Sequence, residues 1–290
     1  MKGIVALIGL AALAACGGSD DGGPAKYTVS VTVSNLLAGT HVVLLNNGAG
    51  SLTVSASGTI AFANPVPSGA VYSVIVATQP AGQTCTVSQG GGTVTTFNVN
   101  VAVACTANAY QVGGQVSGLL AGASVVLANN SNNGKMIKAN GPFTFSSTVS
   151  SGSAYAVTVL TQPAGESCTV AGGTGTVSGA DVSTVAVKCV ALSYTISATV
   201  TGLANVAGLV LQDNGADNLA VGTGGSHPFS TAISSGGSYS VTISAQPAGH
   251  TCIVQNGSGT VTTANVAVSV VCPDNILYSL LAACRTGDSC

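Results

Sequence analysis

Apolar and polar residues alternate along most of the chain, and this alternation predicts β-strands. From Tyr27 to Ser34, tyrosine and valine occupy every second position, and serine or threonine fill all the others. A period of two places the apolar side chains on one face of a strand, so one face of this segment is expected to be buried. Helical periodicity first occurs in the C-terminal tail, and the pattern therefore predicts an all-β fold.

Further apolar runs follow between turn residues. The next expected strands, each bounded by Gly, Ser, Asn or Pro, cover residues 42–45, 52–56, 60–63, 72–77, 84–87 and 97–105. The sequence Asn46-Asn47-Gly48 predicts a tight turn because asparagine and glycine tolerate positive φ. About seven short strands in about 80 residues predict an antiparallel β-sandwich of Greek-key type.

The whole pattern occurs three times. The sequence Gln79-Pro80-Ala81-Gly82-Gln83-Thr84-Cys85 returns with small changes at residues 162–168 and 246–252, and each copy leads to a valine-rich run that ends in a second cysteine. Tyr27, Tyr110 and Tyr194 open the copies at separations of 83 and 84 residues. Solenoid repeats are shorter, about 20 to 50 residues, so these units are expected to be tandem domains.

We call the expected sandwich domains repeat 1 (27–106), repeat 2 (110–190) and repeat 3 (194–273). Linkers without glycine or proline join them, which predicts little hinge freedom. Residues 274–290 form a tail. In it, Asp274 can cap a short helix with aliphatic residues on one face, namely Ile276, Leu277, Leu280 and Leu281.

Repeat 2 resembles two known sandwich families. The run from Val112 to Leu127, the sequence Phe143-Thr144-Phe145 and the run from Ser151 to Val159 are similar to carboxypeptidase-regulatory-like and bacterial Ig-like domains. Repeats 1 and 3 match less closely, since Asn35 replaces the glycine that precedes the leucine, and a glycine is shifted after Asn205. The resemblance implies Ig-like or prealbumin-like sandwiches and no catalytic residue.

The N-terminus has the layout of a bacterial export signal. Lys2 precedes an apolar run, Ile4 to Ala15, that is shorter than the roughly 20 residues of a transmembrane helix. The run ends in Leu13-Ala14-Ala15-Cys16, which resembles the lipobox of bacterial lipoproteins. The resemblance implies a signal peptide at 1–15, a lipidated Cys16 and, with Gly17 next, an outer-membrane location. Residues 16–26 are then a flexible tether. The alternative is an ordinary secretory signal with an unrelated cysteine.

Nine cysteines are present, and eight remain after Cys16. In an exported protein disulfides are expected, one within each repeat: Cys85 with Cys105, Cys168 with Cys189, and Cys252 with Cys272. Cys284 and Cys290 are left over. They either close a small loop, which we favour, or link two molecules, or lie in a frayed end. A metal site or redox pair would need clustered ligands or Cys-x-x-Cys spacing, and the sequence has neither.

The sequence contains no recognisable catalytic arrangement. His41, His227 and His250 have no plausible catalytic partner near them in sequence, and no Ser-His-Asp motif or phosphate-binding glycine loop occurs. We therefore expect no catalytic residue, no cofactor and no metal. His250 occupies a variable position of the Gln-Pro-Ala-Gly-x-x-Cys motif, where the other copies have Gln83 and Glu166, and this position is expected to be exposed. The motif itself is interpreted as a turn rather than a binding signature.

One acidic segment allows two interpretations. Asp213 to Asn218 contains carboxylate and amide oxygens that could hold calcium. It aligns with Asn46-Asn47-Gly48 and with Asn129-Asn130-Ser131, which lack the acids, and a hairpin turn is therefore favoured.

Composition narrows the function classes. Only 5% of residues are charged and tryptophan is absent. Dispersed basic residues predict no nucleic-acid binding. The lack of tryptophan argues against an aromatic platform for glycans. Few charges leave edge strands lightly guarded, so weak self-association through them is expected.

Together these features predict a lipid-anchored protein of the bacterial cell envelope, held to the outer membrane and facing either the surface or the periplasm. It would act as a non-catalytic structural or adhesive stalk. The alternative is a surface binding module that recognises an extracellular glycan or partner protein through distal loops of repeat 3, around Asp213 to Ser226.

Overall fold

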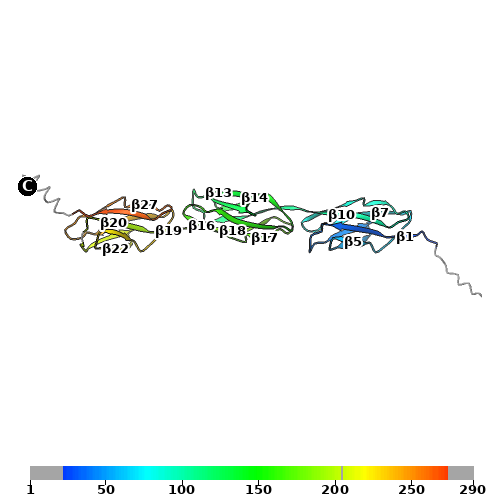
Figure 1. The fold of residues 1–290 in the computed structure, drawn as a ribbon, viewed down its shortest axis with the longest axis horizontal. Coiled ribbons are helices and arrows are strands. Elements are labelled where there is room, and N and C mark those ends of the chain that lie inside the picture. The colour runs from blue at the N-terminus through cyan, green and yellow to red at the C-terminus, as the bar shows by residue number, and fades with distance from the viewer. Residues whose placement is uncertain (1–21, 204, 274–290) are drawn as a thin grey trace, which may run out of the picture. The chain divides into compact units, whose positions relative to one another are not determined.

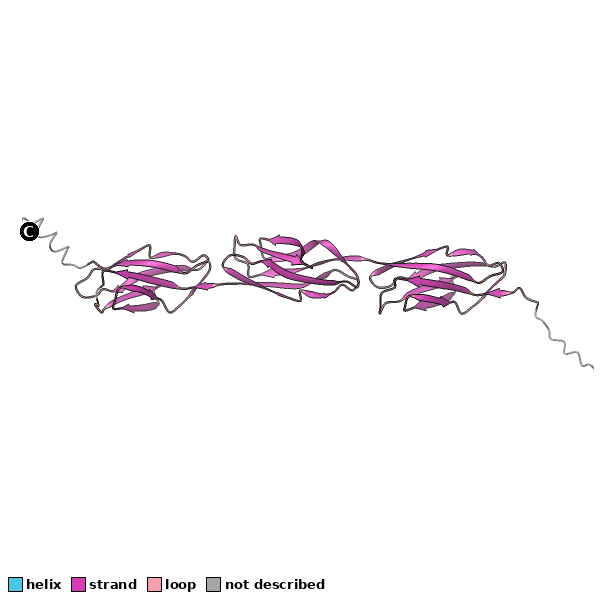
Figure 2. Ribbon diagram, viewed as in Figure 1, coloured by secondary structure: helices cyan, strands magenta, loops and turns pink. Residues whose placement is uncertain are grey.

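The computed structural model describes residues 22–203 and 205–273. All regular structure in these residues is β-strand (Figure 1, Figure 2), and they contain no helix long and apolar enough to cross a membrane. The predicted all-β fold is confirmed. The helix expected after Asp274 lies outside the described residues. The chain forms two compact units, Met1–Thr106 with repeat 1 and Ala107–Cys290 with repeats 2 and 3.

Repeat 1 is a sandwich of two four-stranded sheets. Its strands are β1 (Lys26–Tyr27), β2 (Val29–Ser34), β3 (Val42–Asn46), β4 (Gly50–Val54), β5 (Gly58–Ala61), β6 (Val66–Pro67), β7 (Val71–Thr78), β8 (Gln83–Ser88), β9 (Gly91–Thr93) and β10 (Val99–Ala107). One sheet has the order β5-β2-β10-β8 and the other β4-β3-β7-β9, with β1 and β6 as a separate pair.

Repeat 2 has the same two sheets. Its strands are β11 (Ala109–Ser117), β12 (Val125–Asn129), β13 (Asn132–Ile137), β14 (Gly141–Ser150), β15 (Ala154–Thr161), β16 (Glu166–Ala171), β17 (Thr174–Thr176) and β18 (Val182–Ala191). The sheet orders are β14-β11-β18-β16 and β13-β12-β15-β17.

Repeat 3 follows the arrangement of repeat 1. Its strands are β19 (Ser193–Tyr194), β20 (Ile196–Thr201), β21 (Leu209–Asp213), β22 (Asp217–Val221), β23 (Gly225–Pro228), β24 (Ile233–Ser234), β25 (Ser238–Ala245), β26 (Ile253–Gln255), β27 (Ser258–Thr260) and β28 (Val266–Val271). The sheets are β23-β20-β28-β26 and β22-β21-β25-β27, and β19 pairs with β24.

The alternation in the sequence becomes the inner and outer face of each sheet. Val29, Val31 and Val33 of β2 are buried, as their shared parity predicted. Each repeat encloses its own hydrophobic core, and its cysteine pair is part of that core. In repeat 2 the rings of Phe143 and Phe145 meet edge to face with centroids 5.7 Å apart. Burial of one such side chain stabilises the fold by about 1.5 to 3 kcal/mol.

Each repeat also contains one parallel strand pair, which differs from a purely antiparallel sandwich. β2 pairs with β10, β11 with β18 and β20 with β28, all in parallel. In repeats 2 and 3 the remaining neighbours are antiparallel. Alternation identifies the buried face of a strand but carries no information on its direction, and these strands are too distant in sequence to be joined by a hairpin.

Several strand boundaries differ from the prediction. β10 begins at Val99, so Phe97 lies before the strand and its side chain is 75% exposed. β4 and β5 begin at Gly50 and Gly58, earlier than their apolar residues indicated. The two-residue strands β1 and β6 were not predicted, because two residues are too few to show an alternation of apolar and polar positions.

A Gly-Gly sequence interrupts the alternation in the central strand β11, at Gly113 and Gly114. The register with β14 and β18 shifts here. A Cβ on Gly113 would contact the carbonyl oxygen of Phe143, and one on Gly114 would contact that of Val185. Glycine is therefore required by the close approach of the neighbouring strands.

Candidate functional site

The cysteines form one disulfide in each sandwich. The pairs are Cys85–Cys105, Cys168–Cys189 and Cys252–Cys272. All six side chains are buried. In repeat 2 the two cysteines are direct partners in the register of β16 and β18. The fold prediction of one disulfide per β-sandwich is confirmed.

The Gln-Pro-Ala-Gly sequence before each cysteine strand is a turn. The residue after its glycine donates its N–H to the proline carbonyl, at 3.3 Å for Gln83 and Pro80 and 3.4 Å for Glu166 and Pro163. The glycines have positive φ, for example +74° at Gly165, which glycine adopts at little cost. The interpretation as turn chemistry is confirmed.

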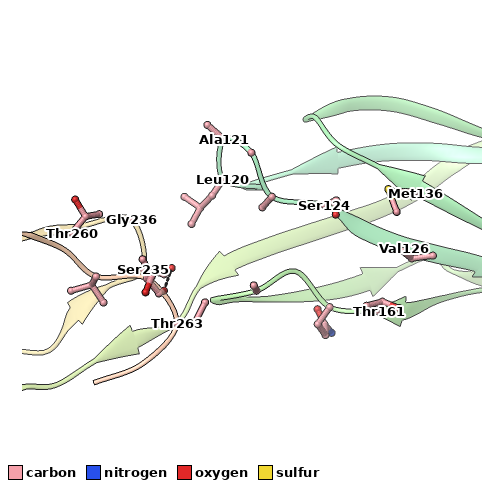
Figure 3. Close-up of a pocket in the computed structure, with 16 residues that line it drawn as sticks. Leu120, Ala121, Ser124, Val126, Met136, Thr161, Ser235, Gly236, Thr260 and Thr263 are labelled. Carbon is pink, nitrogen blue, oxygen red and sulfur yellow. Dashed lines mark hydrogen bonds between the residues drawn. The ribbon is translucent and has the colours of Figure 1, made fainter. Parts of the chain in front are cut away.

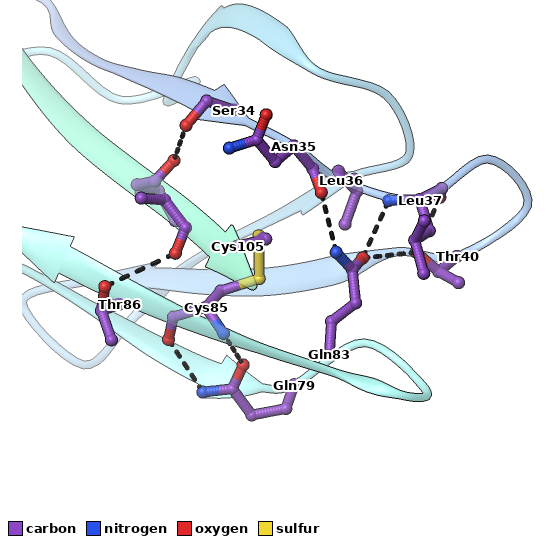
Figure 4. Close-up of a disulfide and its surroundings, with 12 residues drawn as sticks. Ser34, Asn35, Leu36, Leu37, Thr40, Gln79, Gln83, Cys85, Thr86 and Cys105 are labelled. Atoms are coloured by element: carbon purple, nitrogen blue, oxygen red, sulfur yellow. Dashed lines mark hydrogen bonds between the residues drawn. A yellow bond between two sulfur atoms is a disulfide. The ribbon is translucent and has the colours of Figure 1, made fainter. Parts of the chain in front are cut away.

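The glutamine of the motif holds the edge of the cysteine strand. In repeat 1, Cys85 N–H donates to Gln79 Oε1 at 2.7 Å, and Gln79 Nε2 donates to Cys85 O at 3.0 Å (Figure 4). Gln162 and Gln246 bind Cys168 and Cys252 in the same way. Strands β8, β16 and β26 are edge strands, so the amide occupies backbone groups that an added strand would use.

Sequence reasoning missed this role of the glutamine, which we call the glutamine clamp. The signal was present, because glutamine is identical in all three copies at Gln79, Gln162 and Gln246. The pairing depends on the turn bringing the side chain back alongside a residue six positions later, and a propensity rule for turns does not describe that return.

The variable position after the turn is buried rather than exposed. Gln83 and Glu166 are 3% and 2% exposed, and His250 is half-buried. The prediction that this position faces solvent is therefore wrong. In repeats 1 and 2 the side chain at this position binds the backbone of a neighbouring loop.

The contacts of this position show the difference. Gln83 Oε1 accepts the N–H of Leu37 at 2.8 Å, and its Nε2 donates to the carbonyl of Asn35 at 2.7 Å (Figure 4). Glu166 Oε1 accepts the N–H of Leu120 at 3.0 Å. Its Oε2 is buried without a hydrogen-bond partner. Gln83 donates an N–H from the corresponding amide nitrogen, and a carboxylate has no N–H to donate.

The acidic segment of repeat 3 forms a hairpin turn, as favoured. Asp213 and Asp217 are opposite each other in the register of β21 and β22. Asp213 Oδ1 accepts the N–H of Ser240 at 2.8 Å. Asn46 and Asn129 accept equivalent N–H groups in the other repeats. The acid therefore has the same structural task as the amides.

Asp217 organises the neighbouring loop. Its Oδ1 accepts from Ser230 Oγ and its Oδ2 from the N–H of Thr231, both at 2.8 Å. These hydrogen bonds hold the pKa of Asp217 below its ordinary value, and the bond from the Ser230 side chain has the largest effect. Across the described residues, no group of three or more His, Cys, Asp or Glu side chains could hold a metal ion.

The loops expected to form one distal surface are divided between the two ends of repeat 3. Asp213 and Ile233 line one small cavity, and Ile233 pairs with Tyr194 at the start of the repeat. Gly224, by contrast, donates its N–H to Leu203 beyond the end of β20. The segment from Asp213 to Ser226 therefore does not form a single recognition surface, because its strand β22 runs the length of the sheet.

The histidines have separate surroundings. His41 is exposed in repeat 1. His227 Nε2 lies 2.9 Å from the carbonyl oxygen of Thr223 in repeat 3, and His250 lies in the turn before Cys252. Each belongs to a different loop or strand.

Repeats 2 and 3, which share one compact unit, meet at Leu192. The N–H of Leu192 donates to Gly165 O at 2.8 Å, and its carbonyl accepts from the N–H of Ser235 at 2.7 Å. Ser235 Oγ donates to the carbonyl of Thr262. A Cβ on Gly165 would contact Ser235 Oγ and lie 2.9 Å from Thr262 O. The turn of repeat 2 therefore packs directly against repeat 3.

A groove of about 710 Å³ lies at this meeting point (Figure 3), and we call it the junction groove. Repeat 2 lines it with Leu120, Ala121, Val126 and Met136, and repeat 3 with residues that include Ser235 and Thr263. The repeat 2 side of the groove is largely aliphatic.

Three site residues named from the sequence lie outside the described residues. They are Cys16 of the lipobox, and Cys284 and Cys290 of the tail. Their lipidation and pairing stay predictions.

No protein-family model matches the chain, and no curated protein matches it in sequence. Solved structures are similar in fold. The TIE protein of Bacillus anthracis aligns at 11% identity and a TM-score of 0.47, over 86% of this chain and 50% of its own. This chain therefore spans about half the length of that protein.

Two further structures cover the same share of this chain. The B repeat units of the collagen-binding protein CNA of Staphylococcus aureus align at 12% identity and a TM-score of 0.25, over 75% of their length. BcpA, the major pilin subunit of Bacillus cereus, aligns at 12% identity and a TM-score of 0.30, over its whole length. With TM-scores below 0.5, we draw no conclusion about this chain from these similarities.

Proposed function

We propose that this protein is a lipid-anchored component of the bacterial cell envelope that acts as a non-catalytic structural or adhesive stalk. The observation that carries the proposal is the threefold recurrence of one disulfide-bonded sandwich with a glutamine clamp at one edge. Its conspicuous polar side chains, such as Gln79, Gln83 and Asp213, hold backbone groups in place.

The disulfides support a location outside the cytoplasm, since such bonds persist in oxidising compartments. Each links cysteines 20 or 21 positions apart. In the chain-entropy model, closing a loop of this size stabilises a domain by about 3 kcal/mol. Domains of about 80 residues bury a modest core, so this is a large share of their stability.

The anchor is part of the proposal and is supported by the lipobox sequence that ends at Cys16. Each buried methylene of an acyl chain contributes about 0.8 kcal/mol, and more than one chain is needed for stable attachment. A lipidated Cys16 with a following Gly17 favours the outer membrane.

Lipidation is tested by the substitution Cys16→Ser. The unsubstituted protein is expected to partition into detergent and to carry the mass of the acyl groups on its N-terminal peptide. The variant should lose both properties. A variant that still partitions with membranes, together with an unmodified Cys16 in the parent protein, would contradict anchoring through this residue.

Surface exposure is tested by adding trypsin to intact cells. Lys138 follows the edge strand β13 and is exposed, so cleavage there reports access from outside the cell. Cleavage in intact cells supports a surface stalk or adhesin. Protection in intact cells, with cleavage after permeabilisation, would exclude the surface role and leave a periplasmic one.

A further inference from the structure

Repeat 2 exposes two large apolar side chains, Met136 and Leu160, which we call the patch, at positions where the other repeats have smaller or polar residues. Met136 and Leu160 are 57% and 62% exposed. The register places Met136 opposite Val126, and the corresponding residues opposite Val43 and Val210 are Thr53 and Ala220. The position of Leu160 is taken by Ala77 in repeat 1 and by Ser244 in repeat 3. The sandwich therefore does not need large apolar side chains there.

The patch is continuous with the junction groove. Val126 and Met136 line that groove. A Cβ on Gly134 would lie 3.6 Å from both Leu160 and Val126, so these two side chains are neighbours. Exposed apolar side chains that border a groove are a common feature of protein-binding surfaces. The groove is also continuous with the contact between repeats 2 and 3.

The tail contains the matching aliphatic residues. Ile276, Leu277, Leu280 and Leu281 recur at the spacing of one helical face and begin three positions after Pro273, the last described residue. We propose that the junction groove and its patch bind the aliphatic segment 276–281 of a second copy of this chain.

Reach favours a second copy over the chain's own tail. β28 has six residues and spans about 20 Å. Thr263 lines the groove and precedes the first residue of β28, whereas Pro273 follows the last residue of β28. The tail therefore starts at the opposite end of this strand from the groove. A helical segment of eight residues covers only about 12 Å. A fully extended one covers about 29 Å, which brings Leu281 near the rim but leaves Ile276 far from it.

The two partner surfaces differ, so the contact is heterologous. A tail and a groove on every copy link molecules head to tail, and such a contact produces rings or open chains rather than a simple symmetric dimer. A head-to-tail contact therefore predicts a series of assemblies whose size grows with protein concentration.

Photo-crosslinking of the full mature protein in detergent tests the contact. A photoreactive amino acid replaces Leu280, and unlabelled chains are mixed with ¹⁵N-labelled chains. The expected product is a mixed-isotope crosslink between the tail peptide and peptides that contain Met136 or Leu120. Crosslinks confined to a single chain, crosslinks only to detergent or other proteins, or no crosslink would overturn the proposal.

Substitutions that borrow residues from the other repeats provide a second test. Met136→Thr combined with Leu160→Ala should fold normally, because Thr53 and Ala77 occupy these positions in repeat 1. It should reduce the crosslink at least fivefold. The control is Ile75→Thr, which alters an exposed apolar residue of repeat 1 and should leave the crosslink unchanged. Equal yields in all three proteins would overturn the assignment.

Discussion

At the scale of single residues, the buried polar side chains hydrogen-bond to backbone groups of neighbouring strands and loops. Asn46, Asn129 and Asp213 are each nearly buried and each accept a backbone N–H at the start of the next long strand. Gln83 holds a loop through both its carbonyl and its amide. A buried polar group that lacks a partner costs about 1 to 3 kcal/mol, so the quality of these fits affects the stability of each repeat.

Glu166 is the poorly matched member of this group, and the substitution Glu166→Gln should stabilise repeat 2. An amide could donate to the carbonyl of Gly118, which stands where Asn35 accepts from Gln83. The expected gain is about 1 to 3 kcal/mol. Slower hydrogen exchange at the Leu120 N–H would measure it. The reciprocal change Gln83→Glu should destabilise repeat 1. If both substitutions shift stability in the same direction, the explanation is wrong.

Asp217 should contribute a pH-dependent part of the stability of repeat 3. Its hydrogen bonds lower the pKa in the folded state below the ordinary value of 3.8. The contribution is therefore present above the pKa of the unfolded chain and is lost as the pH falls through the folded-state pKa. In Ser230→Ala, which removes the largest cause, the carboxyl pKa followed by NMR should rise toward the ordinary value. An unchanged titration would contradict the assigned cause.

At the scale of secondary-structure elements, the edge strands are the vulnerable parts of each sandwich. The glutamine clamp satisfies the outward N–H and C=O of the cysteine at the point where the disulfide joins the edge strand to its neighbour. The glutamine side chain thus holds the backbone of the cysteine on the outer side of the edge strand, and the disulfide links the same residue to the neighbouring strand. The clamp also makes this part of the edge unavailable to another strand. Self-association is therefore not expected at this part of the edge.

Removal of the clamp by Gln162→Ala should destabilise β16. Two hydrogen bonds are lost, each with a net value of about 0.5 to 1.5 kcal/mol. Exchange of the Cys168 N–H should accelerate about 5- to 150-fold, the range that corresponds to a loss of about 1 to 3 kcal/mol. Gln115→Ala, on an exposed position of β11, is the matched control and should change little. Comparable acceleration in the control would mean that the effect is not due to the clamp.

Most of the element pattern could be predicted from the sequence, for a physical reason. Alternation reports which face of a strand is buried, and repetition alone aligns Cys85 with Cys168 and Cys252 along the chain. The partners of a strand are set by distant residues, so the parallel pairing of β2 with β10 was not predictable from local patterns. The clamp of Gln79 and the burial of Gln83 depend on how a turn folds back, which the same patterns do not encode.

At the scale of the whole molecule, the sandwiches are linked by very little chain. Leu192 alone separates β18 from β19, and its two backbone groups are held by Gly165 and Ser235. Within the unit that contains repeats 2 and 3, the linker is therefore a hydrogen-bonded part of the structure. A stalk benefits from such a joint, because force or thermal motion must break specific contacts before the two repeats can bend.

Gly165 should be the sensitive residue of this joint. Gly165 and Gly249 occupy equivalent positions, with φ of +74° and +75°, so an alanine at either site carries the same backbone strain, about 1 to 2 kcal/mol. A Cβ on Gly249 meets nothing within 4 Å, whereas one on Gly165 contacts Ser235 Oγ. Gly165→Ala should therefore accelerate hydrogen exchange at Leu192 and Ser235, at least tenfold more than Gly249→Ala does. Since both variants share the turn strain, the difference isolates packing between the repeats, and equal exchange in the two would show that the turn of repeat 2 does not hold the joint.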